Sequence, residues 1–136
     1  MIYQAKIVKN DDGWSVSFPD KENIFTEGVT FEEAFRNAED ALNLTLDTEF
    51  NLGMDIEPSR RHKGKDFYDI SVNPQIVVAY ELKAMRAGKT QLEFAHTVGT
   101  TQQDYQRLEK SKSNPTIRTL EKIARANGKR LEIHFV

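Results

Sequence analysis

The sequence predicts an α+β protein with two domains: a β-β-β-α-β unit over residues 1–72 and an all-α helix-turn-helix domain over residues 73–136 that ends in a β-strand. Three observations predict this class. Apolar and polar residues alternate near the N-terminus, which is the period of a strand. Later segments begin with a capping threonine and repeat apolar residues at helical spacing. The net charge also changes sign between the two halves.

The composition excludes several classes of protein. The chain has 136 residues, with 19 Lys and Arg against 21 Asp and Glu, and it has no cysteine. Disulfides, Cys-ligated zinc, iron–sulfur clusters and thiol nucleophiles are therefore excluded, and a reducing compartment is expected. The longest apolar run, residues 76–80, is far shorter than the roughly 20 residues of a spanning helix, and the N-terminus lacks the pattern of a signal peptide. We expect a cytoplasmic protein without a membrane partner.

Charge is divided along the chain. Residues 1–58 carry four basic and 13 acidic side chains, a net charge of −9. Residues 59–136 carry 15 basic and eight acidic side chains, a net charge of +7. This division favours two partners of opposite sign, and the alternative is chance unevenness of the surface composition.

Strands are predicted through most of the acidic half. Residues 9–13, Lys-Asn-Asp-Asp-Gly, are typical of a tight turn and join the first two strands as a hairpin. The predicted strands cover residues 2–8, 14–18, 24–26 and 66–72.

One long helix is predicted between the third and fourth strands. The Thr-x-x-Glu box that begins at Thr30 starts it, and an apolar stripe continues to Phe50. The opposite face is acidic and includes Glu49, which we expect in solvent. Residues 51–65 follow as an exposed basic loop, which either is only solvated or contacts phosphate.

Four short helices are predicted in the basic half. Pro74 and Gly88 mark the two ends of the first. Thr90 and Thr101 begin the next two, each with an acidic residue three positions later, and the last follows Thr116. Short helices joined by turns of three or four residues are typical of a helix-turn-helix domain.

Residues 91–110 resemble the helix-turn-helix of the phage repressor and Cro family. Small Ala95 leaves room between the two helices, and Gly99 suits the positive φ of the turn. The apolar residues expected to face inward here and in the last helix are Leu92, Phe94, Val98, Tyr105, Leu108, Ile117, Leu120, Ile123 and Ala124. The resemblance implies binding to double-stranded operator DNA.

Polar side chains on the predicted third helix suit base readout. If Tyr105 and Leu108 face the core, four side chains project outward together: Gln102, Gln103, Gln106 and Arg107. Gln can bond adenine and Arg can bond guanine in the major groove. The resemblance implies phosphate contacts for Gln91, Thr101, Lys110, Lys112 and Asn114. The alternative is a polar helix face that is only solvated.

The end of the chain alternates again and predicts a terminal strand. Its apolar side chains are Leu131, Ile133 and Phe135. A lone strand needs a partner, so it either pairs with a second chain or returns to the sheet. We favour a homo-dimer or a higher oligomer, which would match a palindromic operator.

The N-terminal half resembles the HicB antitoxins of bacterial HicA–HicB toxin–antitoxin systems. The matching segments are Tyr3, residues 12–20, residues 26–28, Glu33-Ala34 and residues 38–42. The resemblance implies a partial RNase H-like sheet that binds and blocks a small basic HicA ribonuclease, which cleaves mRNA. We expect the toxin-binding surface to include Trp14, Asp20, Glu22 and Glu27. An acidic domain fits a basic partner, because opposite potentials speed encounter.

Other functions are disfavoured by the absence of a convergent site. An RNase H-type nuclease needs several carboxylates around Mg²⁺, but the first strand carries none and the three histidines are scattered. We therefore predict no catalytic residues, no metal site, no cofactor and no enzymatic activity. The expected function is an antitoxin that also represses its own operon. The alternative is a stand-alone transcriptional regulator whose N-terminal domain senses a ligand.

Overall fold

The computed structural model describes all 136 residues and divides into two compact units, Met1–Val77 and Val78–Val136. The division falls five residues after the expected one at residue 72. Helix α2 (Pro74–Arg86) begins in the first unit, where Ile76 is 3% exposed and lies in the core, with Val77 packed against it. The first turn of this helix therefore belongs to the first unit.

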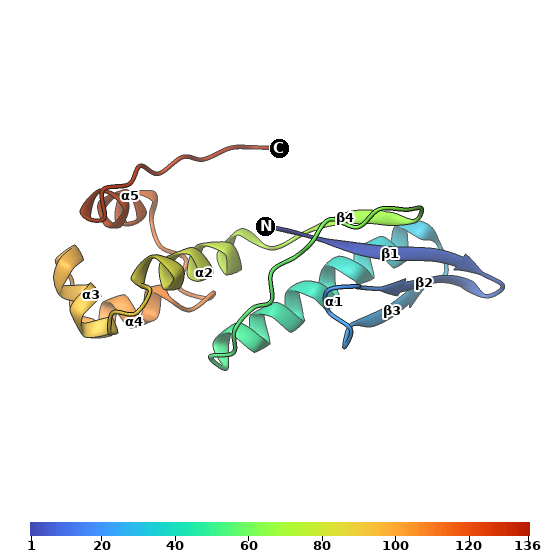
Figure 1. Ribbon diagram of the computed structural model, residues 1–136, viewed down its shortest axis with the longest axis horizontal. Helices are drawn as coiled ribbons and strands as arrows, with labels where there is room; N and C mark the ends of the chain where they lie inside the picture. Colours follow the sequence, from blue (N-terminus) through green and yellow to red (C-terminus); the bar gives the residue numbers. More distant parts are fainter. The chain divides into compact units, whose positions relative to one another are not determined.

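The first unit is a four-stranded antiparallel sheet with one long helix, in the expected order β-β-β-α-β (Figure 1). The sheet order is β3-β2-β1-β4, and each neighbouring pair is antiparallel. The strands are β1 (Ile2–Asn10), β2 (Gly13–Ser17), β3 (Phe25–Gly28) and β4 (Phe67–Ser71). Tyr3, Ala5 and Ile7 of β1 are buried against the helix. Gln4 and Lys6 have the opposite parity and lie on the other face of the sheet.

Helix α1 (Phe31–Asn51) begins where the sequence predicts, because the hydroxyl of Thr30 accepts a hydrogen bond from the Glu33 amide. At Gly28 the edge strand approaches it closely: a Cβ there would stand 2.3 Å from the Ala34 amide nitrogen. The buried stripe of α1 consists of Ala34, Ala38, Leu42, Asn43, Leu46 and Phe50. No helix of the structure combines the length and the apolar composition that crossing a membrane requires.

Two polar residues of α1 contact other parts of the first unit, and one of them, Asn43, is buried. Asn43 donates to the carbonyl of Ser71 (3.1 Å) and accepts from the amide of Asn73 (2.6 Å), so it joins the helix to the end of β4. Glu49, expected in solvent, forms a 2.6 Å ion pair with Lys21, and both side chains are nearly buried. The expectation for Glu49 is wrong. Helical spacing shows which face of the helix a residue lies on, but it does not show that Lys21 from a distant loop covers that residue.

The second unit contains the rest of α2 and three shorter helices, as predicted: α3 (Gln91–Val98), α4 (Gln102–Leu108) and α5 (Ile117–Ala126). Its core residues are Leu82, Phe94, Ala95, Val98, Tyr105 and Ile123, with Leu108 and Leu120 packed against them. Leu92 and Ile117, expected to face inward, are 60% and 63% exposed. Each lies in the first turn of its helix, where the outer side of that turn faces away from the core.

The predicted terminal strand does not form in the single chain. Residues 129–136 have no regular secondary structure, and Figure 1 shows them as an extended end after α5. Ile133 is 55% exposed and Phe135 is 99% exposed. The alternation predicts a strand, but a strand is stabilised by ladder hydrogen bonds that no other segment of this chain supplies.

Candidate DNA-binding and partner-binding surfaces

Helices α3 and α4 each begin at a capping threonine and are separated by a tight turn. The hydroxyls of Thr90 and Thr101 accept hydrogen bonds, each 3.1 Å long, from the amides of Glu93 and Asp104. Gly99 ends α3 in the left-handed conformation with φ of 76°. Only a few residues separate the helices, so α4 is held against α3 at the spacing expected of a helix-turn-helix.

Tyr105 fixes which side of α4 faces outward. Its ring is fully buried, lies 4.9 Å from the ring of Phe94 and donates through its hydroxyl to the carbonyl of Leu82 (3.3 Å). The exposed side of the helix then carries the four residues expected for base readout: Gln102, Gln103, Gln106 and Arg107. These side chains lie on one helix, as predicted, and their contacts with DNA stay a prediction.

A buried ion pair that the sequence did not indicate stabilises the end of α4. Arg86 donates through Nε and Nη2 to the two carboxylate oxygens of Glu109, at 2.6 Å and 2.9 Å. The Glu109 side chain is 6% exposed and that of Arg86 is 17% exposed. Burial acts to raise the pKa of Glu109, but the hydrogen bonds from Arg86 and other donors hold it below its ordinary value. The Glu109 hydrogen bond in turn raises the pKa of Arg86.

The residues expected at phosphates lie at both ends of α4 and at the start of α3. Gln91 is half-buried and donates to Glu109 (3.3 Å), which leaves one of its two amide hydrogens free for another acceptor. Thr101 is exposed and uses its oxygen as the cap of α4. Lys110, Lys112 and Asn114 are exposed in the loop that follows the helix.

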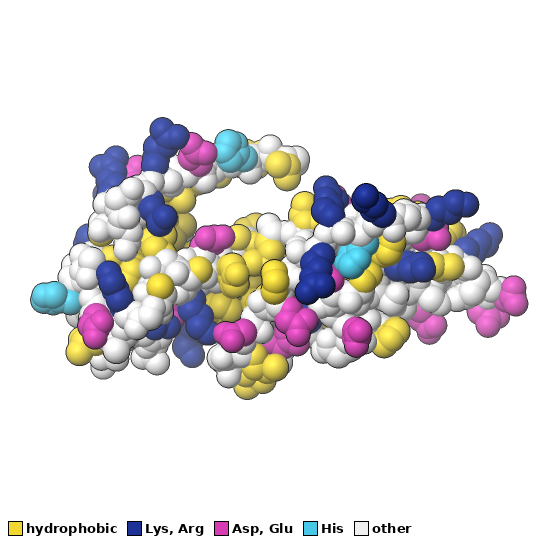
Figure 2. Space-filling view, viewed as in Figure 1, with side chains coloured by type: hydrophobic (Ala, Val, Ile, Leu, Met, Phe, Trp, Pro, Cys, Tyr) yellow, Lys and Arg dark blue, Asp and Glu magenta, His cyan; other side chains and the backbone are white.

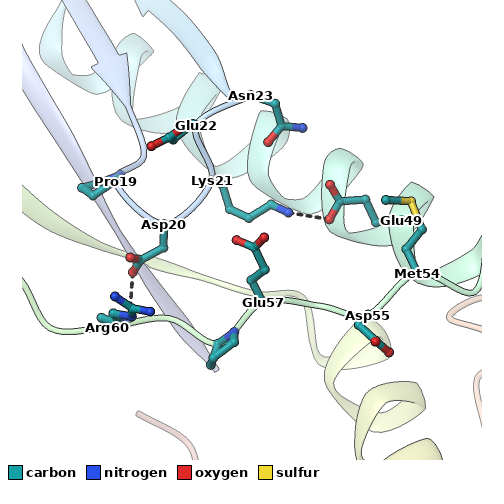
Figure 3. A pocket seen from close by; sticks show the side chains of 11 residues that line it. Pro19, Asp20, Lys21, Glu22, Asn23, Glu49, Met54, Asp55, Glu57 and Arg60 are labelled. Atoms are coloured by element: carbon teal, nitrogen blue, oxygen red, sulfur yellow. Dashed lines mark hydrogen bonds and ion pairs between the residues drawn. The ribbon is translucent and has the colours of Figure 1, made fainter.

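The first unit contains a hollow of about 630 Å³ beside the turn after β2 (Figure 3). Residues 19–23 form one side of it and residues 54–60 the other, with Glu49 of α1 between them. The lining includes five acidic side chains, from Asp20, Glu22, Glu49, Asp55 and Glu57, and two basic ones, from Lys21 and Arg60. Lys21 already pairs with Glu49, so the hollow has an acidic balance.

The four residues expected at the toxin surface do not form one cluster. Asp20 and Glu22 line the hollow. Trp14 instead packs edge-on against Phe31, with ring centroids 5.4 Å apart, at the border of the core. Glu27 lies on the edge strand β3 and does not line the hollow.

Asp20 is tied to the basic loop. Its carboxylate accepts from the amide of Arg60 (2.7 Å) and lies 3.0 Å from Nε2 of His62. Burial acts to raise the pKa of Asp20, but these two partners lower it below its ordinary value. No group of three or more His, Asp or Glu side chains is arranged to hold a metal ion.

Comparison with known proteins identifies the family. Residues 82–133 match the model of a helix-turn-helix family. The whole chain is similar to Antitoxin HicB 2 of Photorhabdus laumondii, with 31% identity over 133 residues that cover 98% of this chain and 95% of the relative. The chain belongs to the HicB antitoxin family. Its HicB relatives include Antitoxin HicB 1 of the same bacterium, with 30% identity over 90% of this chain and 79% of that one.

One solved structure is also similar to part of this chain. The HicA3 and HicB3 toxin–antitoxin complex contains a chain that is 26% identical, with a TM-score of 0.44 over 54% of this chain and all of that chain.

Proposed function

We propose that this HicB-family chain neutralises a HicA-type ribonuclease through its first unit and represses its own operon through α4. The similarity to a HicB antitoxin over 98% of the chain is the observation that carries this proposal. The helix-turn-helix match and the geometry of α4 support the DNA-binding role. The chain acts by binding two macromolecules and is not an enzyme.

Base readout is assigned to the exposed face of α4. Gln and Arg side chains there have the donors and acceptors that the edges of adenine and guanine require. Arg107 has only a long contact of 3.7 Å with Asp104, and both side chains are more than half exposed. Such an exposed pair is weak, so Arg107 is available for guanine.

A pair of substitutions tests readout against anchoring. Arg107→Ala should cost about 1–3 kcal/mol on a duplex of the chain's own promoter and relax the preference at one base pair. Lys112→Ala should weaken binding to promoter and scrambled duplexes alike. It should also lower the slope of log K against log salt concentration, the salt slope, by about one unit. Titrations of both duplexes at several salt concentrations measure this. Equal loss on the two duplexes for Arg107→Ala would refute the readout role.

Toxin binding is assigned to the acidic hollow of the first unit. Glu22 and Glu57 are exposed at the hollow, where they can meet basic side chains of a toxin. Glu22→Lys should weaken binding of the cognate toxin at least tenfold, and Glu32→Lys, an equal charge change at an exposed site of α1 outside the hollow, is the matched control. Calorimetry with the catalytically inactive toxin measures both. If the two variants bind alike, the inhibitory surface lies elsewhere.

Dimerisation is assigned to the terminal segment 131–136. Exposed Ile133 and Phe135 support this, because pairing with a second copy of the segment would bury them and supply ladder hydrogen bonds. Removing residues 131–136 should shift the protein toward monomer in sedimentation. A truncated chain that stays dimeric at low concentration would exclude this segment as the dimer contact.

A further inference from the structure

The basic loop of the first unit is held across the sheet by a series of specific contacts. We name residues 57–65 the strap. The hydroxyl of Tyr3 donates to the carbonyl of Glu57, and the amide of Arg60 donates to Asp20. These contacts hold the strap near the sheet at its first end. A segment that composition alone would describe as a solvated loop therefore has a fixed backbone here.

Further contacts fix the middle of the strap. The amide of His62 donates to Oε1 of Gln4 (2.7 Å), and the His62 ring stacks on Phe67 with centroids 5.5 Å apart. Arg61 forms a 3.1 Å ion pair with Asp69 of β4. Gln4, Phe67 and Asp69 have the parity of the sheet face that α1 does not cover, so the strap crosses that face.

The strap carries basic side chains on this fixed backbone. Residues 60–65 contain two Arg, two Lys and one His and no acidic residue. Lys63 and Lys65 are exposed, and Lys6 of β1 is exposed on the same face of the sheet. Figure 2 shows Lys and Arg side chains gathered around a histidine on this part of the molecule, with acidic side chains along the lower margin.

The strap face carries positive charge, whereas the first unit as a whole has a negative net charge. Residues 1–77 carry eight basic and 15 acidic side chains, a net charge of −7. At physiological salt, charges more than about 8 Å apart are largely screened, so a bound polyanion responds to the strap rather than to the far acids. Asp20 and Asp69, two carboxylates that contact the strap, are engaged by His62 and Arg61, and exposed Glu57 and Asp66 lie at the two ends of the strap.

We propose that the strap face is a second nucleic-acid contact, which binds phosphates of duplex DNA. This inference rests on the proposed DNA-binding role of α4. A few exposed lysines bind phosphate weakly alone, but covalent linkage to a DNA-bound unit raises their effective concentration to the millimolar range. Because the backbone of the strap is ordered on folding, little conformational entropy is lost when its cations meet the duplex.

Duplex DNA is favoured over a protein partner for a chemical reason. Residues 60–65 offer separated point charges and no apolar side chain, which suits a regular array of phosphates, while exposed Ile2, Val8 and Phe25 have the parity of the same sheet face. A protein interface needs a buried apolar centre, and residues 60–65 contain no apolar side chain that could supply one. The acidic hollow of the same unit shares Glu57, Pro58 and Arg60 with the first end of the strap, whereas Lys63 and Lys65 do not line it.

A charge-matched pair of double variants tests the proposal in the full chain. Lys63→Gln with Lys65→Gln removes two cations of the strap. Lys9→Gln with Arg36→Gln removes two exposed cations of the same unit that lie outside the strap. Binding to a random-sequence duplex of about 40 base pairs is measured over a range of salt concentrations. The strap variant should lower the slope of log K against log salt by about 1.8 units, and the control should leave it unchanged.

The outcomes separate this inference from the proposed function. If both double variants change the slope equally while Lys112→Ala still lowers it, the strap makes no DNA contact and the second unit still does. If the strap variant keeps its slope but loses affinity for the toxin, the face binds protein and the inference is overturned. If the unmodified chain binds no DNA, both the inference and the repressor role fail.

Discussion

Replacing Glu109 by Gln should destabilise the second unit strongly, because it leaves a buried cation without its counter-charge. Glu109 is 6% exposed and accepts two hydrogen bonds from Arg86, at 2.6 Å and 2.9 Å. Breaking one side of such a pair typically costs about 3–5 kcal/mol. The low end, about 3 kcal/mol, applies here because Arg86 keeps 17% exposure and a hydrogen bond to the carbonyl of Lys89. For a unit of this size that loss lowers the melting temperature by roughly 12–24 °C.

The two units can be followed separately in one protein. Trp14 is the only tryptophan and lies in the first unit, so its fluorescence reports the unfolding of that unit alone. Circular dichroism at 222 nm reports the helices of both units. Glu109→Gln should lower a helical transition and leave the Trp14 transition unchanged. Glu121→Gln is the control, because its pair with Arg125 is exposed and 3.6 Å long and contributes less than about 1 kcal/mol.

Acidification should produce the same loss in the unmodified protein. The pKa of Glu109 is lower in the folded chain than its ordinary value of 4.5, so the folded state binds this proton less readily than the unfolded state does. The stabilisation is therefore complete above about pH 4.5 and is lost as the pH falls through the folded value. Urea unfolding between pH 7 and 3 measures this slope. A slope that Glu109→Gln leaves unchanged, or a variant as stable as Glu121→Gln, would refute the reasoning.

Three further substitutions test how the elements are joined. Gly28→Ala should cost about 1–3 kcal/mol in the Trp14 transition, because the new Cβ would stand 2.3 Å from the Ala34 amide nitrogen. Asn43→Ala should cost about 1–3 kcal/mol in the same assay, because it removes two part-buried hydrogen bonds to backbone groups at the end of β4. Thr101→Ala should lower the stability of the second unit by about 1 kcal/mol through loss of the α4 cap, measured by circular dichroism.

Local features of the fold could be predicted from the sequence because their causes are local. The hydroxyls of Thr30, Thr90 and Thr101 each accept a hydrogen bond from the amide three residues later, as the capping pattern in the sequence predicts. Alternation placed the strands of the sheet for the same reason, since one face of each strand meets α1. The outward face of α4 followed from the inward position of Tyr105, which is fully buried.

Contacts between distant residues could not be predicted in this way. Lys21 and Glu49 are 28 residues apart, and Arg86 and Glu109 are 23 apart, so no period links them. Of these four residues only Glu49 was expected in solvent, and that expectation is wrong because burial of a charged residue depends on the partner that the fold brings to it. The strap was missed for the same reason: the composition of residues 60–65 predicts exposure, whereas acceptors on Gln4 and Asp20 hold its backbone.

Glu109 also connects stability to the proposed DNA contacts. It stands between Arg107, assigned to a base, and Lys110, assigned to a phosphate, at the point where α4 ends and the loop begins. Loss of DNA affinity in Glu109→Gln can therefore arise from a smaller folded fraction or from a displaced Lys110. A smaller folded fraction weakens promoter and scrambled duplexes by one factor at every salt concentration. A displaced Lys110 instead lowers the salt slope by about one unit, because one phosphate contact is lost, so titrations below the melting transition distinguish the two causes.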